Sequence, residues 1–566
     1  MLTLSNRPDY STLLDAVTLT AAASDRPAII YVTSDQPPIH VSRAEFVTAS
    51  THYAAALRQL AIEPGDLLII AHTQNLESIY AFWGALLIGA VPSMFPTLTE
   101  KLDPDIYMES MAELARLSDV SAVLTSDEFA RSLAGNLPCP VYGSTRLAAA
   151  VQDQAQATFE PHQPDPAAIA FLQHSSGTTG LQKGVALSHA AVLNQLASYA
   201  VALDLNQQDV VASWLPLYHD MGLIAGFLLP LFQGLPLVLM SPFDWVRHPA
   251  LLLRAIDRHG GTLCWLPNFA YNHSARRIRG RDAEGLSLAS MRAFINCSEP
   301  VRDDSHQLFL ERFAENGLRP EVLSVSYAMA ENTFAVTQTP IGQRPHVDIV
   351  NRLALEEARE ARQGDVAHEG ARLMVSCGPP IDGTEVRVVA DDGASLGERR
   401  VGQLAVRSDC MLTGYYKRPD LSPFQDGWYL TGDMGYIADG EVYIVGRSKD
   451  LIINAGKNIY PQDIEAIVND VPGVHPGRAV VFGVPDRREG TELIAVVAEF
   501  KDPLAAADVE TTKTINKAIR QEVARQSMVT VSYVQLVGPK WLIKTSSGKI
   551  ARAANRAKWL AERDLA

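Results

Sequence analysis

The eleven residues His174-Ser175-Ser176-Gly177-Thr178-Thr179-Gly180-Leu181-Gln182-Lys183-Gly184 combine glycines and hydroxyl side chains with a single lysine. They follow residues 168–172, an apolar run that is typical of a buried strand. Glycines let the backbone approach a ligand, N–H and hydroxyl groups donate hydrogen bonds, and the lysine supplies a positive charge. Gln182 stands where the Walker A pattern requires its second glycine, so the stretch is not that motif. It therefore predicts a buried strand followed by a loop that binds the polyphosphate of ATP.

The rest of the chain predicts an α/β fold. Short apolar runs alternate with helical patterns over the first 440 residues, as in the strand at 67–71 and the helix at 76–88. This rhythm predicts mostly parallel sheets covered by helices. Closely spaced, glycine-rich strands around 376–445 predict a small antiparallel sheet or barrel within the same domain.

The domain organisation follows from where these patterns change. We expect a large N-terminal domain over residues 1–446, a hinge at 447–450, and a small, mobile α+β C-terminal domain over 451–566. Residues 340–372 are polar, charged and poor in strand pattern, which predicts an inserted segment.

Composition limits the class of protein. A length of 566 residues, 47% of them hydrophobic, predicts a globular protein with more than one core. The net charge of −15 argues against a nucleic-acid partner. Five scattered cysteines and an N-terminus without a signal peptide predict a cytoplasmic protein. Residues 222–240 are strongly apolar, but prolines, a glutamine and a glycine interrupt them, so we expect a buried helix and strand and no transmembrane segment.

Six further motifs follow the loop in a fixed order. They occupy residues 214–222, 296–300, 327–331, 429–433, 446–450 and 544–550. With the loop, they resemble the adenylate-forming superfamily of acyl-CoA synthetases, peptide-synthetase adenylation domains and luciferases. The resemblance extends over about residues 40–555. Residues 215–223, 267–271, 298–301 and 460–465, and the insertion, are most similar to fatty acyl-AMP ligases.

This resemblance implies a two-step reaction. A carboxylic acid, most simply a fatty acid, attacks the α-phosphate of ATP and gives acyl-AMP and pyrophosphate. The acyl group then passes to the phosphopantetheine thiol of an acyl carrier protein, because a similar insertion in that group accompanies poor use of coenzyme A. Two alternatives remain open: an acyl-CoA synthetase that uses free coenzyme A, and a catalytically silent protein that only binds an adenylate.

The resemblance also implies roles for individual residues. Glu331 would hold Mg²⁺, His219 would border the acyl pocket, and Lys549 would bridge the attacking carboxylate and the α-phosphate. Asp433 would bind the ribose hydroxyls, and Arg447 would lie near the ribose and phosphates. The phosphates would be held by Ser175, Ser176, Gly177, Thr178, Thr179, Gly180 and Lys183. The adenine would lie between Tyr327, Ala328 and Met329 on one side and Ser298, Glu299 and Pro300 on the other.

Several of these residues also have an ordinary structural explanation. Glu331 could be a solvated helix glutamate, Asp433 a turn aspartate, and Arg447 a salt bridge between domains. Tyr327 and His219 could be core side chains. The same choice, acyl tunnel or ordinary core, applies to Trp265, Phe269 and Tyr271.

Overall fold

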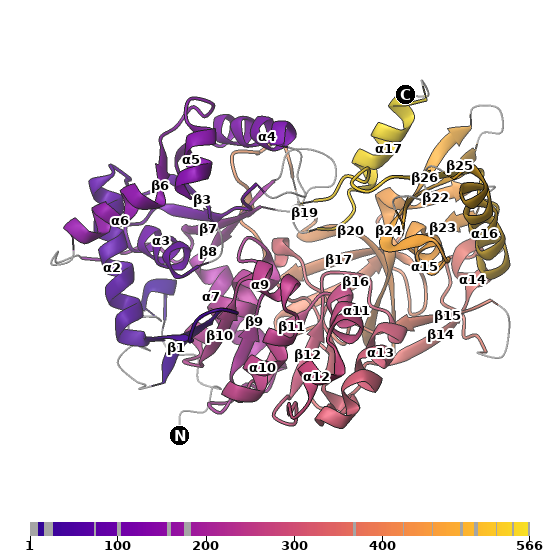
Figure 1. Ribbon diagram of the computed structural model, residues 1–566, viewed down its shortest axis with the longest axis horizontal. Helices are drawn as coiled ribbons and strands as arrows, with labels where there is room; N and C mark the ends of the chain where they lie inside the picture. Colours follow the sequence, from indigo (N-terminus) through magenta and orange to yellow (C-terminus); the bar gives the residue numbers. More distant parts are fainter. Residues whose placement is uncertain are drawn as a thin grey trace.

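The computed structural model of the 566-residue chain has a large body and a smaller lobe that carries the C-terminus (Figure 1). The residues that it describes are 10–15, 26–72, 75–98, 104–154, 160–174, 183–365, 370–422, 424–454, 457–486, 491–502, 508–527, 529–545 and 548–563. Among them, no helix is both long and apolar enough to cross a membrane.

The centre of the large body is a seven-stranded sheet in the order β13-β12-β11-β9-β10-β1-β2. Its strands are β1 (Pro27–Val32), β2 (Ile39–Ser42), β9 (Val211–Ser213), β10 (Leu237–Met240), β11 (Leu263–Leu266), β12 (Ala293–Asn296) and β13 (Leu323–Val325). All neighbours are parallel except β1 and β2, which form an antiparallel edge. The short apolar runs that form these strands are almost wholly buried, as expected for a parallel sheet that is covered on both faces.

A second, fully parallel sheet has the order β4-β3-β5-β6. Its strands are β3 (Leu67–Ala71), β4 (Val91–Met94), β5 (Val120–Thr125) and β6 (Val141–Gly143). Three antiparallel strands, β7 (Ile169–His174), β8 (Gly184–Ser188) and β18 (Gly414–Tyr415), lie beside it. Strand β7 is the buried strand that was predicted to precede the glycine-rich loop.

Helices cover these sheets (Figure 1). They are α2 (Arg43–Gln59), α3 (Leu76–Leu87), α4 (Pro104–Leu117), α5 (Asp127–Leu133), α6 (Ser144–Asp153), α7 (His189–Ala202), α8 (Leu229–Phe232), α9 (Pro242–Arg247), α10 (Ala250–His259), α11 (Asn268–Arg277), α12 (Gly280–Ala283) and α13 (Asp303–Phe313). The apolar stretch at 222–240 forms the π-helix η1 (Met221–Leu228), α8 and β10, all buried. The predicted buried helix and strand are therefore present.

The last part of the large body is antiparallel, as predicted. It contains β16 (Thr384–Val389), β17 (Gly402–Ser408), β19 (Phe424–Gln425), β20 (Trp428–Ala438) and β21 (Glu441–Arg447). The segment 340–372 contains more regular structure than its polar sequence indicated. It holds β14 (Val347–Asn351), which pairs with β15 (Ala371–Val375), and α14 (Arg352–Glu357). Within β14 only Val350 is buried, so there is no alternating apolar pattern to read.

The small lobe is the expected α+β unit. It contains β22 (Ile452–Asn454), β23 (Lys457–Ile459), β24 (Val474–Asp486), β25 (Thr491–Phe500), β26 (Tyr533–Val537), α15 (Pro461–Asn469), α16 (Val509–Ser527) and α17 (Arg552–Ala561). A stripe at helical spacing, Ile515, Ile519 and Val523, buries one face of α16. The segment predicted as the hinge contains the end of β21 and the short 3₁₀ helix η5 (Ser448–Asp450). The domain boundary itself stays a prediction.

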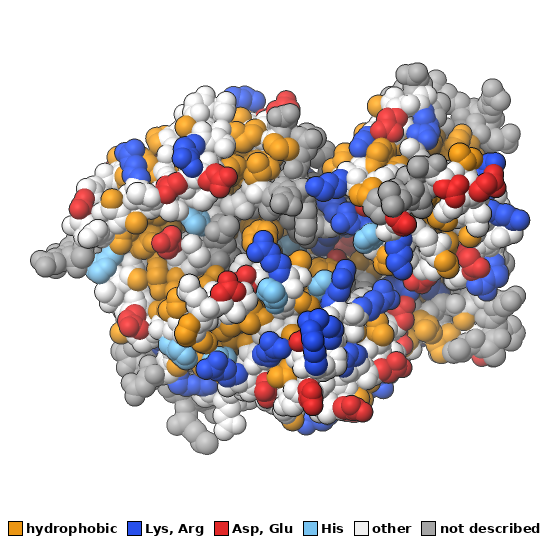
Figure 2. Space-filling view, viewed as in Figure 1, with side chains coloured by type: hydrophobic (Ala, Val, Ile, Leu, Met, Phe, Trp, Pro, Cys, Tyr) orange, Lys and Arg blue, Asp and Glu red, His pale blue; other side chains and the backbone are white. Residues whose placement is uncertain are grey.

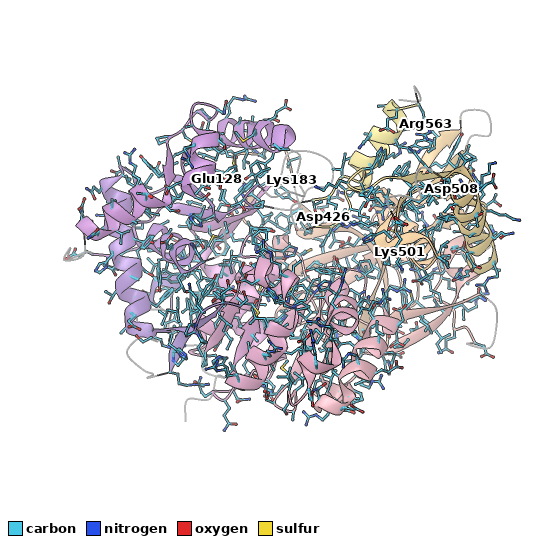
Figure 3. All side chains as sticks on the ribbon, in the orientation of Figure 1. Glu128, Lys183, Asp426, Lys501, Asp508 and Arg563 are labelled. Carbon is cyan, nitrogen blue, oxygen red and sulfur yellow. The ribbon has the colours of Figure 1, made fainter. Side chains whose placement is uncertain are left out.

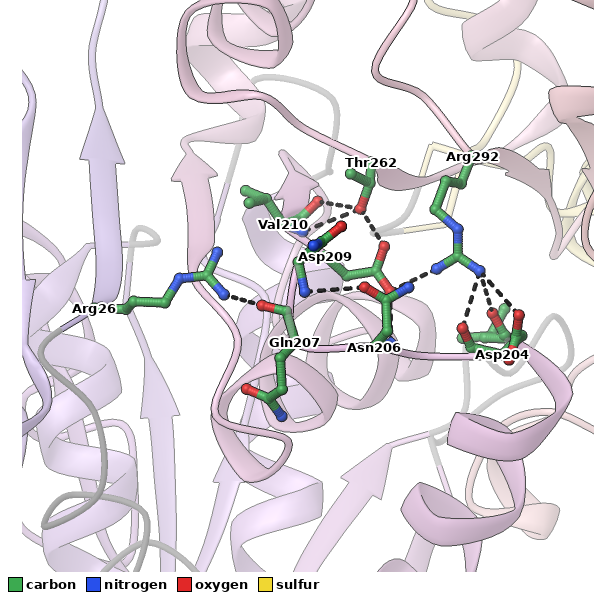
Figure 4. A network of polar contacts seen from close by, with 10 residues as sticks. Arg26, Asp204, Asn206, Gln207, Asp209, Val210, Thr262 and Arg292 are labelled. Atoms are coloured by element: carbon green, nitrogen blue, oxygen red, sulfur yellow. Dashed lines mark hydrogen bonds and ion pairs between the residues drawn. The ribbon is translucent and has the colours of Figure 1, made fainter. Parts of the chain in front are cut away.

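A buried polar network fixes the amino-terminal edge of the central sheet (Figure 4). Asp209, which is fully buried, accepts hydrogen bonds from the Thr262 hydroxyl at 2.7 Å and the Asn206 amide at 2.9 Å. Its other partner is Arg292, whose Nη1 lies 2.5 Å from its carboxylate. These residues precede β9, β11 and β12, so the network aligns the three strands whose opposite ends carry the site described below.

This network predicts an asymmetric effect of two substitutions on stability. We expect Asp209→Asn to lower the free energy of unfolding of the large domain by about 3 kcal/mol, because a partly buried guanidinium loses its charged partner. The matched control is Asp204→Asn, since Asp204 is 94% exposed and lies 3.6 Å from the same arginine. This control should cost less than about 1 kcal/mol. Urea unfolding followed by tryptophan fluorescence measures both, and equal losses would contradict the account.

Candidate active site

Four sequence motifs meet at the carboxyl edge of the central sheet. Trp214 follows β9, Asn268 comes two residues after β11, Ser298 two residues after β12, and Tyr327 two residues after β13. Because these strands are parallel neighbours, their carboxyl ends lie at one edge. Motifs that are more than a hundred residues apart in the sequence therefore form one site.

Glu331 lies at the tip of a narrow hairpin that follows β13. The amide of Val336 donates to the Tyr327 carbonyl at 2.8 Å, and the amide of Met329 donates to the Phe334 carbonyl at 2.9 Å. Between them, η4 (Ala330–Asn332) presents Glu331, which is half-buried.

Two tyrosines surround the Glu331 carboxylate. The Tyr415 hydroxyl donates to Glu331 Oε1 at 3.1 Å, and the hydroxyls of Tyr415 and Tyr429 lie 3.1 Å apart. Burial and the neighbouring carboxylate raise the pKa of both tyrosines above the usual value, so both remain protonated donors. No lysine or arginine of the described chain forms an ion pair with Glu331 within 4.0 Å. A carboxylate oxygen in this setting suits a hard divalent cation such as Mg²⁺.

The predicted phosphate loop can be followed only at its end. Ser175, Ser176, Gly177, Thr178, Thr179 and Gly180 lie outside the described residues. Lys183 is described, and its Nζ lies 4.8 Å from the centre of the Tyr415 ring. In the view of Figure 3, Lys183 lies at the junction between the two lobes. Tyr415 therefore contacts both Lys183, through its ring, and Glu331, through its hydroxyl.

Asp433 and Arg447 face each other on β20 and β21, where they are paired in register. Arg447 Nε donates to Asp433 Oδ1 at 3.1 Å, and the Tyr327 hydroxyl donates to Asp433 Oδ2 at 2.7 Å. Burial and Asp433 raise the pKa of Tyr327 well above its usual value. A carboxylate offers about four acceptor positions, so about two remain for hydroxyl groups of a ligand.

Lys549 reaches the large body from the small lobe. Its Nζ donates to the backbone carbonyl of Ser298 at 2.6 Å. The turn that presents it is closed by the Thr545 amide, which donates to the Lys549 carbonyl at 2.7 Å. Ser298 has a positive φ of 71°, a conformation that is uncommon for a residue with a side chain. The contact brings a positive charge from the C-terminal segment to the carboxyl edge of the central sheet.

His219 and Asp220 lie next to this contact. His219 Nδ1 is 2.5 Å from Asp220 Oδ1, and the Met221 amide donates to the same carboxylate oxygen at 2.8 Å. Burial raises the pKa of Asp220. His219, the Met221 amide and Lys549 together lower it by more, so the pKa of this carboxyl lies below its usual value. The Ser298 hydroxyl is 3.9 Å from Met221 Sδ, which joins this turn to the lysine contact.

The remaining wall residues have mixed surroundings. The Glu299 carboxylate accepts a hydrogen bond from the Phe269 amide at 2.9 Å and so caps the start of α11, while the neighbouring Pro300 is exposed. Trp265 and Tyr271 are fully buried in the core, whereas Phe269 is 43% exposed. Ala328 and Met329 are half-buried beside Tyr327. The roles assigned to these residues stay predictions.

Sequence patterns alone missed Tyr415 as part of the site. The signal that reveals it is a strand pair, since Tyr415 in β18 pairs with Val185 in β8, directly after the phosphate loop. Residues more than two hundred positions apart form this pair, and a two-residue strand has no readable periodicity.

Comparison with known proteins identifies the family. Residues 18–416 match the family model of the AMP-binding enzymes, and residues 456–556 match that of the AMP-binding enzyme C-terminal domain. The long-chain-fatty-acid–AMP ligase FadD32 of Mycolicibacterium smegmatis is 32% identical, over 93% of this chain and 90% of the relative. The medium-chain-fatty-acid–[acyl-carrier-protein] ligase JamA of Moorena producens is 29% identical, over 98% and 96%.

Solved structures agree with the sequence relatives. A structure from a study of fatty acyl-adenylate ligases from E. coli and L. pneumophila superposes with a TM-score of 0.88, covering 99% of both chains at 26% identity. The predicted α/β fold, with its large and small domains, is confirmed. The chain belongs to the AMP-binding family of adenylate-forming enzymes.

Proposed function

We propose that the protein activates a fatty acid with ATP, releases pyrophosphate, and transfers the resulting acyl group to the phosphopantetheine thiol of an acyl carrier protein. The observation that carries this proposal is the hydrogen bond between Lys549 and the Ser298 carbonyl. It brings a cation from the C-terminal segment to the edge that also carries Tyr327, whose hydroxyl donates to Asp433. Relatives named as fatty-acid–AMP ligases support the choice of a fatty acid.

The charges of the site suit the proposed first step. Negative charge grows on the phosphate oxygens as the carboxylate attacks, so fixed cations and donors lower the barrier. Lys549 would contact the carboxylate and the α-phosphate, and Lys183 the outer phosphates. Lysine and arginine side chains gather along the junction between the lobes in Figure 2, which supports binding of a polyphosphate there.

Two carboxylates would orient the nucleotide. Asp433 would accept hydrogen bonds from the ribose hydroxyls while Arg447 and Tyr327 hold it in place. Glu331 would hold Mg²⁺, which, when bound, neutralises part of the phosphate charge. Tyr415 and Tyr429 would keep the Glu331 carboxylate aimed at that cation.

The carrier protein as acceptor rests on two observations. One relative is named as an [acyl-carrier-protein] ligase. In addition, the inserted segment contacts the small lobe: Asn458 Nδ2 donates to the Glu356 carbonyl at 2.7 Å, and Lys457 pairs with Glu357 at 3.0 Å. The segment that the resemblance associates with poor use of coenzyme A thus touches the domain that carries Lys549.

A second candidate is an acyl-CoA synthetase, because a 31% identical relative from Caulobacter vibrioides is named as a putative acyl-CoA synthetase. Competition between acceptors separates the two. With equal concentrations of coenzyme A and a holo acyl carrier protein, we expect the acyl group to appear mainly on the carrier, by mass spectrometry. Preferential formation of acyl-CoA would favour the second candidate.

Removal of the small-domain cation should block the first step. We expect Lys549→Ala to lower fatty-acid-dependent pyrophosphate release about 10²–10³-fold, as the loss of one oriented donor does. The matched control is Lys517→Ala, an exposed lysine of the same domain on α16, which should leave the rate unchanged. Pyrophosphate release by Lys549→Ala at the wild-type rate would refute the assignment.

Neutralising the proposed ribose ligand should weaken nucleotide binding. We expect Asp433→Asn to raise the KM for ATP about 10–100-fold, because hydrogen bonds to a charged acceptor are the strong ones. Asp439→Asn, at an exposed position next to the end of the same strand, is the control. Steady-state kinetics at saturating fatty acid measure both variants, and a KM for ATP that is equal in the two would argue against the ribose contact.

A further inference from the structure

Thr333, two residues after Glu331, adopts a strained backbone conformation. Its φ is 61° and its ψ is −52°, and the Phe334 amide donates to the Asn332 carbonyl at 2.6 Å. A hydrogen bond that spans a single residue at these angles defines a γ-turn of the rare, positive-φ type. Threonine is branched at Cβ and therefore poorly suited to positive φ. Such outliers persist only where the surroundings hold them in place.

The surroundings of Thr333 do hold it. Its side chain is fully buried, and its hydroxyl donates to the Cys410 carbonyl at 2.7 Å. On one side of it, the Asn332 side chain donates to the Ala335 carbonyl at 2.7 Å. On the other, the Phe334 ring is fully buried and packs edge-on against Tyr199, with 5.4 Å between ring centres. The tip of the hairpin therefore has one conformation that the core enforces.

The segment 408–415 forms hydrogen bonds with this tip. Ser408 donates to the Asn332 side chain, Cys410 accepts from Thr333, and the Leu412 amide donates to the Glu331 carbonyl at 2.8 Å. At its end, Tyr415 donates to the Glu331 carboxylate. Alternate residues of one short segment thus contact three successive residues of the tip. We call this set of contacts, from Ser408 to Tyr415, the tip clasp.

The end of the tip clasp pairs with β8, the strand that follows the phosphate loop. Gly414 pairs with Ala186 in β8, and the Tyr416 amide donates to the Gly184 carbonyl at 2.8 Å. Lys183, immediately before Gly184, lies against the Tyr415 ring. Glu331 and Lys183 are therefore connected through the clasp, and the Thr333 hydroxyl is one of its contacts with the tip.

We propose that Thr333 is a positioning residue whose γ-turn and hydroxyl hold the Glu331 carboxylate in the orientation in which it would bind a divalent cation together with ATP, on the side of Tyr415. The inference rests on the proposed function, since it deepens the role of Glu331 in binding nucleotide with its cation. Thr333 itself contacts neither ligand. Under this proposal the strained turn is kept because it fixes the backbone two residues after Glu331.

Equilibrium binding tests the proposal without turnover. In the absence of a fatty acid, calorimetry gives the Kd of ATP once with Mg²⁺ and once with EDTA. For Thr333→Val, which keeps the branched shape and loses the hydroxyl, we expect the Kd with Mg²⁺ to rise about 10-fold, because the Glu331 carboxylate is no longer held in one orientation. The Kd with EDTA should change little. We call the ratio of the Kd with EDTA to the Kd with Mg²⁺ the Mg²⁺ effect. Thr333→Ser, which keeps the hydroxyl, should show the Mg²⁺ effect of the wild type.

Two further variants distinguish positioning from a general loss of structure. Thr339→Val removes another buried hydroxyl of the same hairpin, which donates to the Val325 carbonyl at 3.1 Å without a positive φ. It should lower thermal stability and leave the Mg²⁺ effect intact. Thr333→Gly relieves the strain and should fold even if Thr333→Val does not, yet it should lose the Mg²⁺ effect.

Some outcomes would overturn the inference. They are an unchanged Mg²⁺ effect in Thr333→Gly, an equal loss with and without Mg²⁺ in Thr333→Val, and the same selective loss in Thr339→Val. Failure of the proposed function looks different: the wild type would bind ATP with Mg²⁺ but convert no fatty acid to acyl-AMP. The two results are read from separate measurements.

Discussion

The site depends on one constraint, the parallel alignment of β9, β11, β12 and β13. Parallel strands end at a common edge, so the residues that follow them lie close together although they are far apart in the sequence. At the opposite edge, the ion pair between the buried Asp209 and the partly buried Arg292 ties the start of β9 to the start of β12. Lys549 reaches the site at the carboxyl edge, through the Ser298 carbonyl.

The small lobe completes the site through a few directed contacts. The Lys549 ammonium donates to the backbone carbonyl of Ser298, a residue with a positive φ. Other contacts lie further along the junction, where Arg372 pairs with Asp463 at 3.0 Å and Gln462 donates to the Val445 carbonyl at 2.6 Å. Polar contacts of this kind help to specify the orientation of the two lobes.

Much of the fold was predictable because local patterns of apolar residues along the sequence indicate its helices and strands. The alternation of short apolar runs and helices predicted the parallel sheets, and the stripe of Ile515, Ile519 and Val523 predicted α16. The motifs pointed to Glu331, Asp433, Arg447 and Lys549. The structure pairs Arg447 with Asp433 and brings Lys549 to the Ser298 carbonyl, while the roles of these residues stay predictions. What local patterns could not predict was long-range geometry. The pairing of Tyr415 with Val185 and the positive φ of Thr333 depend on tertiary contacts. The strand at 347–351 was not predicted, and it buries only one of its side chains.

The proposed reaction is the formation of an acyl adenylate at this edge, with Lys549 as the cation that the small lobe supplies. The most direct measurement is fatty-acid-dependent exchange of labelled pyrophosphate into ATP, over saturated acids of medium and long chain length. The account predicts exchange that requires both the acid and Mg²⁺ and needs no thiol acceptor. Absence of exchange with every acid, in a protein that still binds ATP, would contradict it.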